Sequence, residues 1–364
     1  MAEAPVYATD LATRLGLPPP EPPRITLRSA ATVARDVPTT TWLLRPYLEQ
    51  NSIAVLYGDF GTYKSFVALD WAFRIALGLP AIGHGWSRPG APVVFISAEG
   101  RGLWKRIRAW VRHEYAGAEL DVDELLEQVP AYFIEHPVNL SERPTADVLA
   151  QAIDALGVQP ALVVVDTLSR NSSGTVESST ADAAAYLANL DQCLRSRYGA
   201  CVLLVHHVGH AEKGRIRGPI VLAANTDTLL RVERVAAGQP VIRLTHERAK
   251  DSETAADAHL RAAVIDLGLA DEDRQPVTSL ALEATDDVPK AAQAEPRGKH
   301  PPALLAGIRE WSRSNPGKTH ISSIEVEAIC KAQGIPRQRK RKAVDVLIDD
   351  GYLIDATGGY GLTL

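Results

Sequence analysis

One stretch constrains the possible fold more than any other: residues 52–78, with the sequence SIAVLYGDFGTYKSFVALDWAFRIALG. It opens on an apolar run over residues 53–57, which is short enough to be a buried strand. A turn with two glycines follows, and from Ser65 apolar residues recur at helical spacing until Gly78, a typical helix C-cap. A strand, a glycine turn, Lys-Ser and a helix in this order are the context that a phosphate-binding loop requires.

The turn offers the groups that hold ATP and Mg²⁺. A helix N-terminus presents free N–H groups and the positive end of the helix dipole to a phosphate. Gly58 and Gly61 let the backbone curl around it without a Cβ clash. Lys64 would reach the β- and γ-phosphates, and the Ser65 hydroxyl would ligate Mg²⁺. The predicted nucleotide-binding residues are Gly58, Gly61, Thr62, Tyr63, Lys64, Ser65 and Phe66.

One residue departs from the phosphate-binding pattern. G-x-x-x-x-G-K-[ST] asks for glycine before the lysine, where this chain has Tyr63. The alternative interpretation is an ordinary strand–turn–helix corner with an exposed lysine. The polar residues at the strand ends, described below, favour nucleotide binding over this alternative. Tyr63 is therefore expected to affect how fast ATP is hydrolysed and not whether it binds. Its side chain would pack over the ribose or against a neighbouring subunit.

Composition narrows the class of protein. The chain has 364 residues, enough for about two domains, and its net charge of −5 gives no global basic field for nucleic acid. The three cysteines, Cys193, Cys201 and Cys330, lack metal-ligand spacing and are expected to be core thiols in a reducing compartment. With no membrane-length apolar run and no signal pattern, a soluble cytoplasmic protein is expected.

Strands alternate with helices along most of the chain. After the first unit, strands are expected at residues 93–96, 131–134, 161–166 and 201–205, and helices at 103–115, 145–156 and 181–198. This alternation predicts βαβ units and a mostly parallel α/β sheet. The strands are continuously apolar, as expected for a sheet that is covered on both faces.

Polar residues follow several of these strands at the edge where ligands of parallel sheets bind. Asp166 would hold Mg²⁺ together with Ser65. Glu99 would orient or deprotonate the attacking water if its strand neighbours the phosphate-loop strand. His206 or His207 would hydrogen-bond the γ-phosphate. The alternatives are a turn-capping aspartate, a surface carboxylate and core-edge histidines.

After the fifth expected strand, the alternation of strands and helices ends. Residues 226–234, 241–247 and 260–267 are short strand-like segments, expected to extend the sheet in part antiparallel. Residues 285–302 are polar, contain proline and lack periodicity, which is typical of a linker. The predicted organisation is a proline-rich arm with one short helix near residues 11–15, an ATPase domain, this linker and a small domain: 1–38, 39–284, 285–302 and 303–364.

The order of motifs resembles the RepA-like hexameric replicative helicases, RecA-type ATPases of plasmids, phages and integrated elements. The resemblance covers about residues 40–268 and rests on GDFGTYKSF, VVFISAEG, ALVVVDTLSR, VLLVHHVGH, RGPIVLAANTDTLLRVE and THERAKD. It implies a RecA-like core that hydrolyses ATP at subunit interfaces, in a homo-oligomeric ring around single-stranded DNA.

The resemblance also implies roles for individual residues. Lys64 and Ser65 would be the Walker A pair, Asp166 the Walker B aspartate and Glu99 the catalytic carboxylate, with His207 or His206 sensing the γ-phosphate. The loop after the histidines would face the pore, and its Lys213, Arg215 and Arg217 suit a DNA backbone. Arg217 would alternatively reach a neighbour's nucleotide. Arg248 and Lys250 would act in trans on the γ-phosphate; the alternative for these basic residues is a solvated surface.

Residues 303–364 read as three helices followed by a β-hairpin, an arrangement that resembles a winged helix. A basic cluster heads the third helix and would contact double-stranded DNA: Arg337, Arg339, Lys340, Arg341 and Lys342. A solvated charge run on a protein-interaction module is the alternative.

The leading hypothesis is an ATP-dependent DNA helicase or translocase. A nucleotide-switched DNA-binding adaptor with slow hydrolysis is the second hypothesis, and Tyr63 favours it slightly. A RecA-like recombinase is the third, which would form filaments in place of closed rings.

Overall fold

The computed structural model describes residues 27–35, 41–98, 102–118, 121–209, 216–236, 238–287, 300–315, 318–349, 352–356 and 358–362. The chain divides into two compact units at Thr41, and the first contains the exposed helix α2 (Ala30–Arg35). The short helix that the sequence predicts near residues 11–15 lies outside the described residues.

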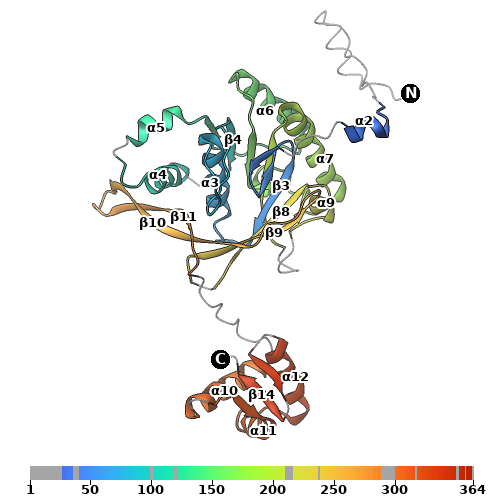
Figure 1. The fold of residues 1–364 in the computed structure, drawn as a ribbon, viewed down its shortest axis with the longest axis vertical. Coiled ribbons are helices and arrows are strands. Elements are labelled where there is room, and N and C mark those ends of the chain that lie inside the picture. The colour runs from blue at the N-terminus through green and yellow to red at the C-terminus, as the bar shows by residue number, and fades with distance from the viewer. Residues whose placement is uncertain are drawn as a thin grey trace, which may run out of the picture. The chain divides into compact units, whose positions relative to one another are not determined.

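Within the described residues, nine strands form one sheet in the order β11-β10-β9-β8-β3-β7-β6-β4-β5. Figure 1 labels β3, β4 and β8 to β11 of this sheet. Six of the nine strands run parallel: β3 (Ile53–Gly58), β4 (Val93–Ser97), β5 (Ala131–Ile134), β6 (Leu162–Asp166), β7 (Cys201–His207) and β8 (Thr228–Arg234). The other three continue the sheet antiparallel: β9 (Val241–Ala249), β10 (Ala258–Ala270) and β11 (Pro276–Ala284). The predicted α/β class, a mostly parallel sheet with an antiparallel extension, is confirmed.

Two hydrophobic clusters cover opposite faces of the parallel strands. Successive side chains of a strand point to opposite faces, so Leu56 joins one cluster and its neighbour Val55 joins the other. The first cluster contains Trp71 and Trp110, which belong to α3 (Lys64–Leu77) and α4 (Leu103–Glu114). The second contains side chains of α6 (Arg143–Ala155) and α7 (Thr180–Leu190). Burial on both faces explains why these strands are continuously apolar.

A buried charge network joins α3 to α4. Arg74 pairs with Asp70 at 2.8 Å, one turn earlier, and with Glu114 of α4 at 2.8 Å. The indole Nε1–H of Trp110 donates to the Asp70 carboxylate at 2.8 Å. Burial raises the pKa of Asp70, so this carboxylate depends on its partners for its charge. The phosphate-loop helix and α4 are therefore fixed to each other in the core.

Several elements differ from the sequence prediction. The expected helix over residues 181–198 is α7, a π-helical turn η2 (Asp191–Arg195) and α8 (Ser196–Tyr198). The prediction missed short elements whose few residues give little periodicity: β1 (Trp42–Leu44), β2 (Leu48–Glu49), α5 (Val122–Gln128), η1 (Leu168–Arg170) and α9 (Ile220–Ala224). It also missed β11, which pairs with β10 in a long hairpin.

The C-terminal residues form three helices and a small sheet with a hydrophobic core of its own, which includes Leu304, Val344 and Tyr352. The helices are α10 (Pro301–Ser314), α11 (Ser323–Ala332) and α12 (Arg337–Asp349). The sheet has the order β12-β14-β13, with strands β12 (His320–Ser322), β13 (Leu353–Ala356) and β14 (Gly359–Leu362). The predicted hairpin is present, and β12 adds a strand that the sequence did not reveal.

The three cysteines are buried free thiols. No helix in the described ranges is both long and apolar enough to cross a membrane.

Candidate nucleotide-binding site

A cavity of about 270 Å³ lies where the phosphate loop meets the ends of two parallel strands. Pairing of β3 with β7 places Gly58 beside His207, and pairing of β7 with β6 places Val205 beside Asp166. The cavity is lined by Phe60, Gly61, Thr62, Tyr63, Lys64, Ser65, Phe66, Arg106, Thr167 and His207. Six of the seven predicted nucleotide-binding residues, those at positions 61–66, line this cavity. The seventh, Gly58, is the last residue of β3.

The loop is closed by its own hydrogen bonds. The Asp59 carbonyl accepts from Lys64 Nζ and from Thr62 Oγ1, each at 2.8 Å. Gly58 is required sterically, because a Cβ there would lie 2.1 Å from the Val232 carbonyl oxygen of β8. Gly61 has a φ of +71°, which glycine adopts without strain. Lys64 is thereby held, 6% exposed, at the amino end of α3.

Tyr63 occupies the glycine position of the motif with the backbone conformation that glycine would have. Its φ and ψ are 62° and 21°, in the left-handed region, which costs a residue with a Cβ about 1–2 kcal/mol. The carbonyl of Tyr63 accepts the N–H groups of Phe66 and Val67 at 3.0 Å, so it begins α3 as a glycine would. The departure from the motif therefore leaves the backbone path of the loop intact.

Three residues of the cavity were not singled out from the sequence: Phe60, Arg106 and Thr167. Phe60 is 65% exposed and stacks on the imidazole of His207 with 4.3 Å between ring centroids. Arg106 of α4 lies over the Phe66 ring at 4.9 Å. The basic character of α4 was visible in the sequence, but nothing local shows which of its residues turns toward the loop.

Ser65 and Asp166 are the predicted magnesium residues. Ser65 lines the cavity, and so does Thr167, which follows Asp166 in the chain. Asp166 is 1% exposed at the end of β6. One hydroxyl and one carboxylate suit Mg²⁺, which keeps several of its waters. This donor set fits the ion that the motif implies.

Glu99 lies outside the described residues, but the strand that precedes it is placed. The condition that this strand neighbours the phosphate-loop strand is wrong: β7 and β6 lie between β3 and β4. The actual neighbour of β4 is the aspartate strand, with Ser97 paired to Asp166. The chain therefore leaves β4 beside Asp166, two strands away from the phosphate loop.

The two histidines have different surroundings because consecutive strand residues face opposite ways. His207 lines the cavity, whereas His206 is fully buried and does not line it. Nε2 of His206 lies 2.8 Å from the carbonyl of Arg217, which can only accept, so this nitrogen carries the proton. Burial lowers the pKa of His206 to about 4, and its ring is neutral at pH 7.

Glu177, in the loop before α7, connects three segments around this edge. It accepts a hydrogen bond from Ser169, pairs with Nε of Arg217 at 3.0 Å and lies 3.9 Å from Nδ1 of His206. Gly218 packs against its backbone, since a Cβ at Gly218 would lie 3.4 Å from the Glu177 Cα. Glu177 was not predicted, because these contacts join distant parts of the chain.

The predicted DNA-contacting loop begins and ends at this cluster. Arg217 donates its backbone N–H to the carbonyl of His207 at 3.0 Å, and its guanidinium is held by Glu177 within the same chain. Lys213 and Arg215 lie outside the described residues.

Arg248 and Lys250 lie far from the phosphate loop of their own chain. Strand pairing places Arg248 beside Leu229 and level with Val55. The distance along the strands to the loop end of β3 is about 10 Å at 3.3 Å per residue. Arg248 donates to the carbonyl of Thr226, and Lys250 pairs with Asp227 at 3.7 Å. Neither residue lines the 270 Å³ cavity.

The basic cluster of α12 is partly neutralised. Glu327 of α11 pairs with Lys340 at 3.1 Å and with Arg337 at 3.7 Å. Arg339, Arg341 and Lys342 are exposed. A cavity of about 490 Å³ adjoins the cluster, between the head of α12 and the hairpin.

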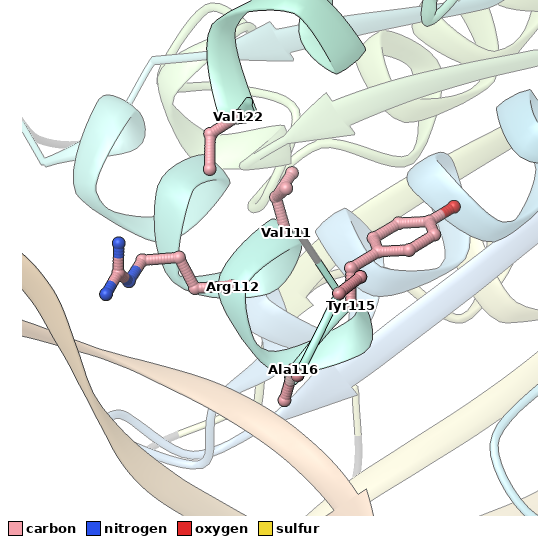
Figure 2. Close-up of a pocket in the computed structure, with 7 residues that line it drawn as sticks. Val111, Arg112, Tyr115, Ala116 and Val122 are labelled. Carbon is pink, nitrogen blue, oxygen red and sulfur yellow. The ribbon is translucent and has the colours of Figure 1, made fainter. Parts of the chain in front are cut away.

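A smaller cavity of about 180 Å³ lies at the carboxyl end of α4 (Figure 2). Its lining includes Val111, Tyr115 and Val122, while the side chain of Arg112 extends away from Tyr115. Helix α4 follows β4 and runs back along the sheet, so its carboxyl end lies toward the amino ends of the parallel strands. The phosphate loop lies at their carboxyl ends. This cavity does not belong to the nucleotide site.

A phosphate loop at the edge of a parallel sheet, with an aspartate ending a nearby strand, defines a P-loop ATPase domain. Residues 19–213, more than half of the chain, match the family model described as an AAA domain. The chain belongs to this family of RecA-like P-loop ATPases, which generally bind ATP with Mg²⁺.

No similar sequence was found among curated proteins. Among solved structures, the chain is similar to the RadB recombinase, with 16% identity, a TM-score of 0.43, and coverage of 58% of this chain and 87% of that one. A likeness at this distance carries no argument about function.

Proposed function

We propose that the protein is an ATP-driven motor on DNA, a helicase or translocase of the RepA-like class that serves replication of a mobile element or phage in the cytoplasm. The observation that carries the proposal is the cavity in which the phosphate loop, the end of β6 and His207 converge. A ring of identical subunits, six by the resemblance, would enclose single-stranded DNA.

Each residue around the cavity has a role in this proposal. Lys64 and the N–H groups of α3 would bind the β- and γ-phosphates, and Ser65 with Asp166 would hold Mg²⁺. The ion, when bound, neutralises charge on the phosphate oxygens. By the resemblance, Glu99 would orient or deprotonate the attacking water. His207, which lines the cavity, would hydrogen-bond the γ-phosphate.

The cluster at Glu177 supports a path from ATP to DNA. His207 is bonded through its carbonyl to Arg217, and Arg217 is bonded to Glu177. A shift of His207 on hydrolysis would therefore displace Arg217, which lies at the base of the loop that carries Lys213 and Arg215. These two basic side chains would hold the phosphates of single-stranded DNA.

Arg248 and Lys250 would serve the nucleotide of a neighbouring subunit. Their position toward the amino end of the parallel strands favours action in trans, because their own cavity lies at the opposite end. A cation placed there would stabilise charge on the transferred phosphoryl group.

Replacement of Arg248 by alanine is expected to lower ATPase activity about 10³-fold, as for other cations that act on the γ-phosphate from a neighbour. Mixing this variant with Lys64→Ala protein should restore part of the activity, since a mixed ring contains sites with an intact loop facing an intact Arg248. Arg243→Ala, on the same strand, is the control. Absence of restoration would show that Arg248 acts within its own chain, through its bond to Thr226.

The chain is proposed to have four parts: an arm at 1–38, the ATPase domain at 39–284, a linker at 285–302 and a winged helix at 303–364. Three helices, a hairpin and a separate core support the last part. Its basic α12 would bind double-stranded DNA through Arg337, Arg339, Lys340, Arg341 and Lys342.

Changing Arg339, Arg341 and Lys342 together to glutamine is expected to weaken binding to duplex DNA. Each lost phosphate contact lowers the slope of log K against log salt by about 0.9, so the slope should fall by at most about 3. Fluorescence anisotropy between low and moderate salt measures it. The control is Arg313→Gln with Lys331→Gln, two exposed residues away from the cluster. An unchanged slope would assign α12 to a protein partner.

One set of measurements tests the proposed function as a whole: ATPase activity with and without single-stranded DNA, strand displacement on a forked duplex, and mass in solution. A motor should show DNA-stimulated turnover, displacement and a ring-sized mass, all lost in Lys64→Ala except the mass. Stimulated turnover without displacement would instead establish the nucleotide-switched adaptor. Filaments seen by electron microscopy would indicate a recombinase.

A further inference from the structure

The contacts around Tyr63 indicate how this chain tolerates a tyrosine where the phosphate loop requires a left-handed residue. Tyr63 has a φ of 62° and is half-buried. Its ring packs edge-on against Phe66, with centroids 6.0 Å apart. The Cβ makes this backbone conformation unfavourable, so the contacts of Tyr63 must offset its cost.

Arg234 supplies three contacts at this point. Its guanidinium lies over the Tyr63 ring, 4.2 Å from the centroid. Nε donates to the carbonyl of Gly61 at 3.0 Å, and Nη1 donates to the carbonyl of Gln239 at 2.6 Å. One side chain therefore holds the loop backbone, the tyrosine ring and a turn beyond β8 together.

The position of Arg234 follows from strand register. Val232 of β8 pairs with Gly58 of β3, so Arg234 lies two residues beyond the point where β3 ends. At that level the chain of β3 has already turned into the phosphate loop, and Arg234 faces it from a strand of the rigid sheet. Cation–π stacking at 4.2 Å and charge-assisted hydrogen bonds are both favourable here.

We propose that Arg234 is a positioning residue that keeps Tyr63 left-handed and so holds the phosphate loop in its binding conformation. The expected effect on ATP affinity rests on the proposed function, whereas the effect of Arg234 on the conformation of the loop does not require ATP. Arg234 does not line the phosphate cavity; it acts through Gly61 and Tyr63. A glycine at position 63 would need no such support.

The test is a double-mutant cycle of Arg234→Ala and Tyr63→Gly in the full chain. Arg234→Ala alone is expected to weaken ATP binding about tenfold, measured as Kd, because the loop loses the support that offsets its strained residue. In the Tyr63→Gly background the same change should have an effect of about twofold or less. Arg234→Lys, which keeps the charge without the planar stack, should fall between.

A second readout works without nucleotide. Amide hydrogen exchange over residues 60–66 should speed up in Arg234→Ala, and this acceleration should disappear in the Tyr63→Gly background. Arg243→Ala, an arginine of the adjacent strand that pairs with Glu233, is the matched control and should leave exchange in the loop unaltered.

The outcomes separate this inference from the proposed function. Equal effects of Arg234→Ala in both backgrounds, or no effect in either readout, would overturn the role of Arg234. If the parent protein binds no ATP while the exchange pattern is as expected, the proposed function fails and the positioning role stands.

Discussion

Lys64→Ala protein is expected to bind ATP weakly and to hydrolyse it at least about 100 times more slowly than the parent protein, the usual cost of losing one donor to a developing phosphate charge. Lys64 lines the phosphate cavity at the amino end of α3, where its ammonium is already held by the Asp59 carbonyl. Alanine is a good helix former, so α3 should remain intact. Steady-state ATPase activity and titration with ATP measure the two effects.

The control for this change is Lys331→Ala, an exposed lysine of α11. It alters the charge of the protein equally and should leave ATP binding and turnover as they are. Circular dichroism and the unfolding midpoint establish that both variants are folded. Full turnover in Lys64→Ala protein would show that the nucleotide site has been assigned to the wrong loop.

Arg74→Ala is expected to destabilise the protein by about 3–5 kcal/mol, measured by urea unfolding. The side chains of Arg74 and Asp70 are only 7% and 3% exposed, so removal of the arginine leaves a buried carboxylate without its main counter-charge. Because burial already raises the pKa of Asp70, its ionised form then loses its largest compensating interaction.

The chain contains a matched control for this effect. Arg143 and Asp147 form the same kind of pair one helical turn apart, at 2.9 Å, but their side chains are 50% and 48% exposed. Arg143→Ala should therefore cost about 1 kcal/mol or less. Similar losses in the two variants would mean that burial is not what makes the Arg74 network important.

Local sequence was sufficient to predict the parallel strands of the core, but not β1, β2 or β11, which also contribute to it. The apolar run before Gly58 predicts β3, and Gly78 ends α3 in the left-handed conformation that its sequence position indicates. These features depend on neighbours along the chain. The strand order depends on pairing between distant segments, so the sequence left open whether β4 neighbours β3, and β7 and β6 lie between them.

The side-chain geometry of the site was less predictable for the same reason. Which of His206 and His207 enters the cavity depends on how β7 packs into the sheet. Arg234 reaches Tyr63 only because β8 pairs with β3 in one register. The sequence indicated that Tyr63 departs from the motif, but the contacts that accommodate it come from residues more than 150 positions away.

The packing of Gly218 on Glu177 has a consequence for how this family can diverge. Gly218 has a φ of +101°, and a Cβ there would lie 3.0 Å from the Leu222 side chain and 3.4 Å from the Glu177 backbone, while the adjacent Arg217 is the ionic partner of the same glutamate. A side chain at position 218 would be strained at this φ, and the Leu222 side chain would have to shift to make room for it. Homologues that keep this turn should accordingly retain glycine at position 218.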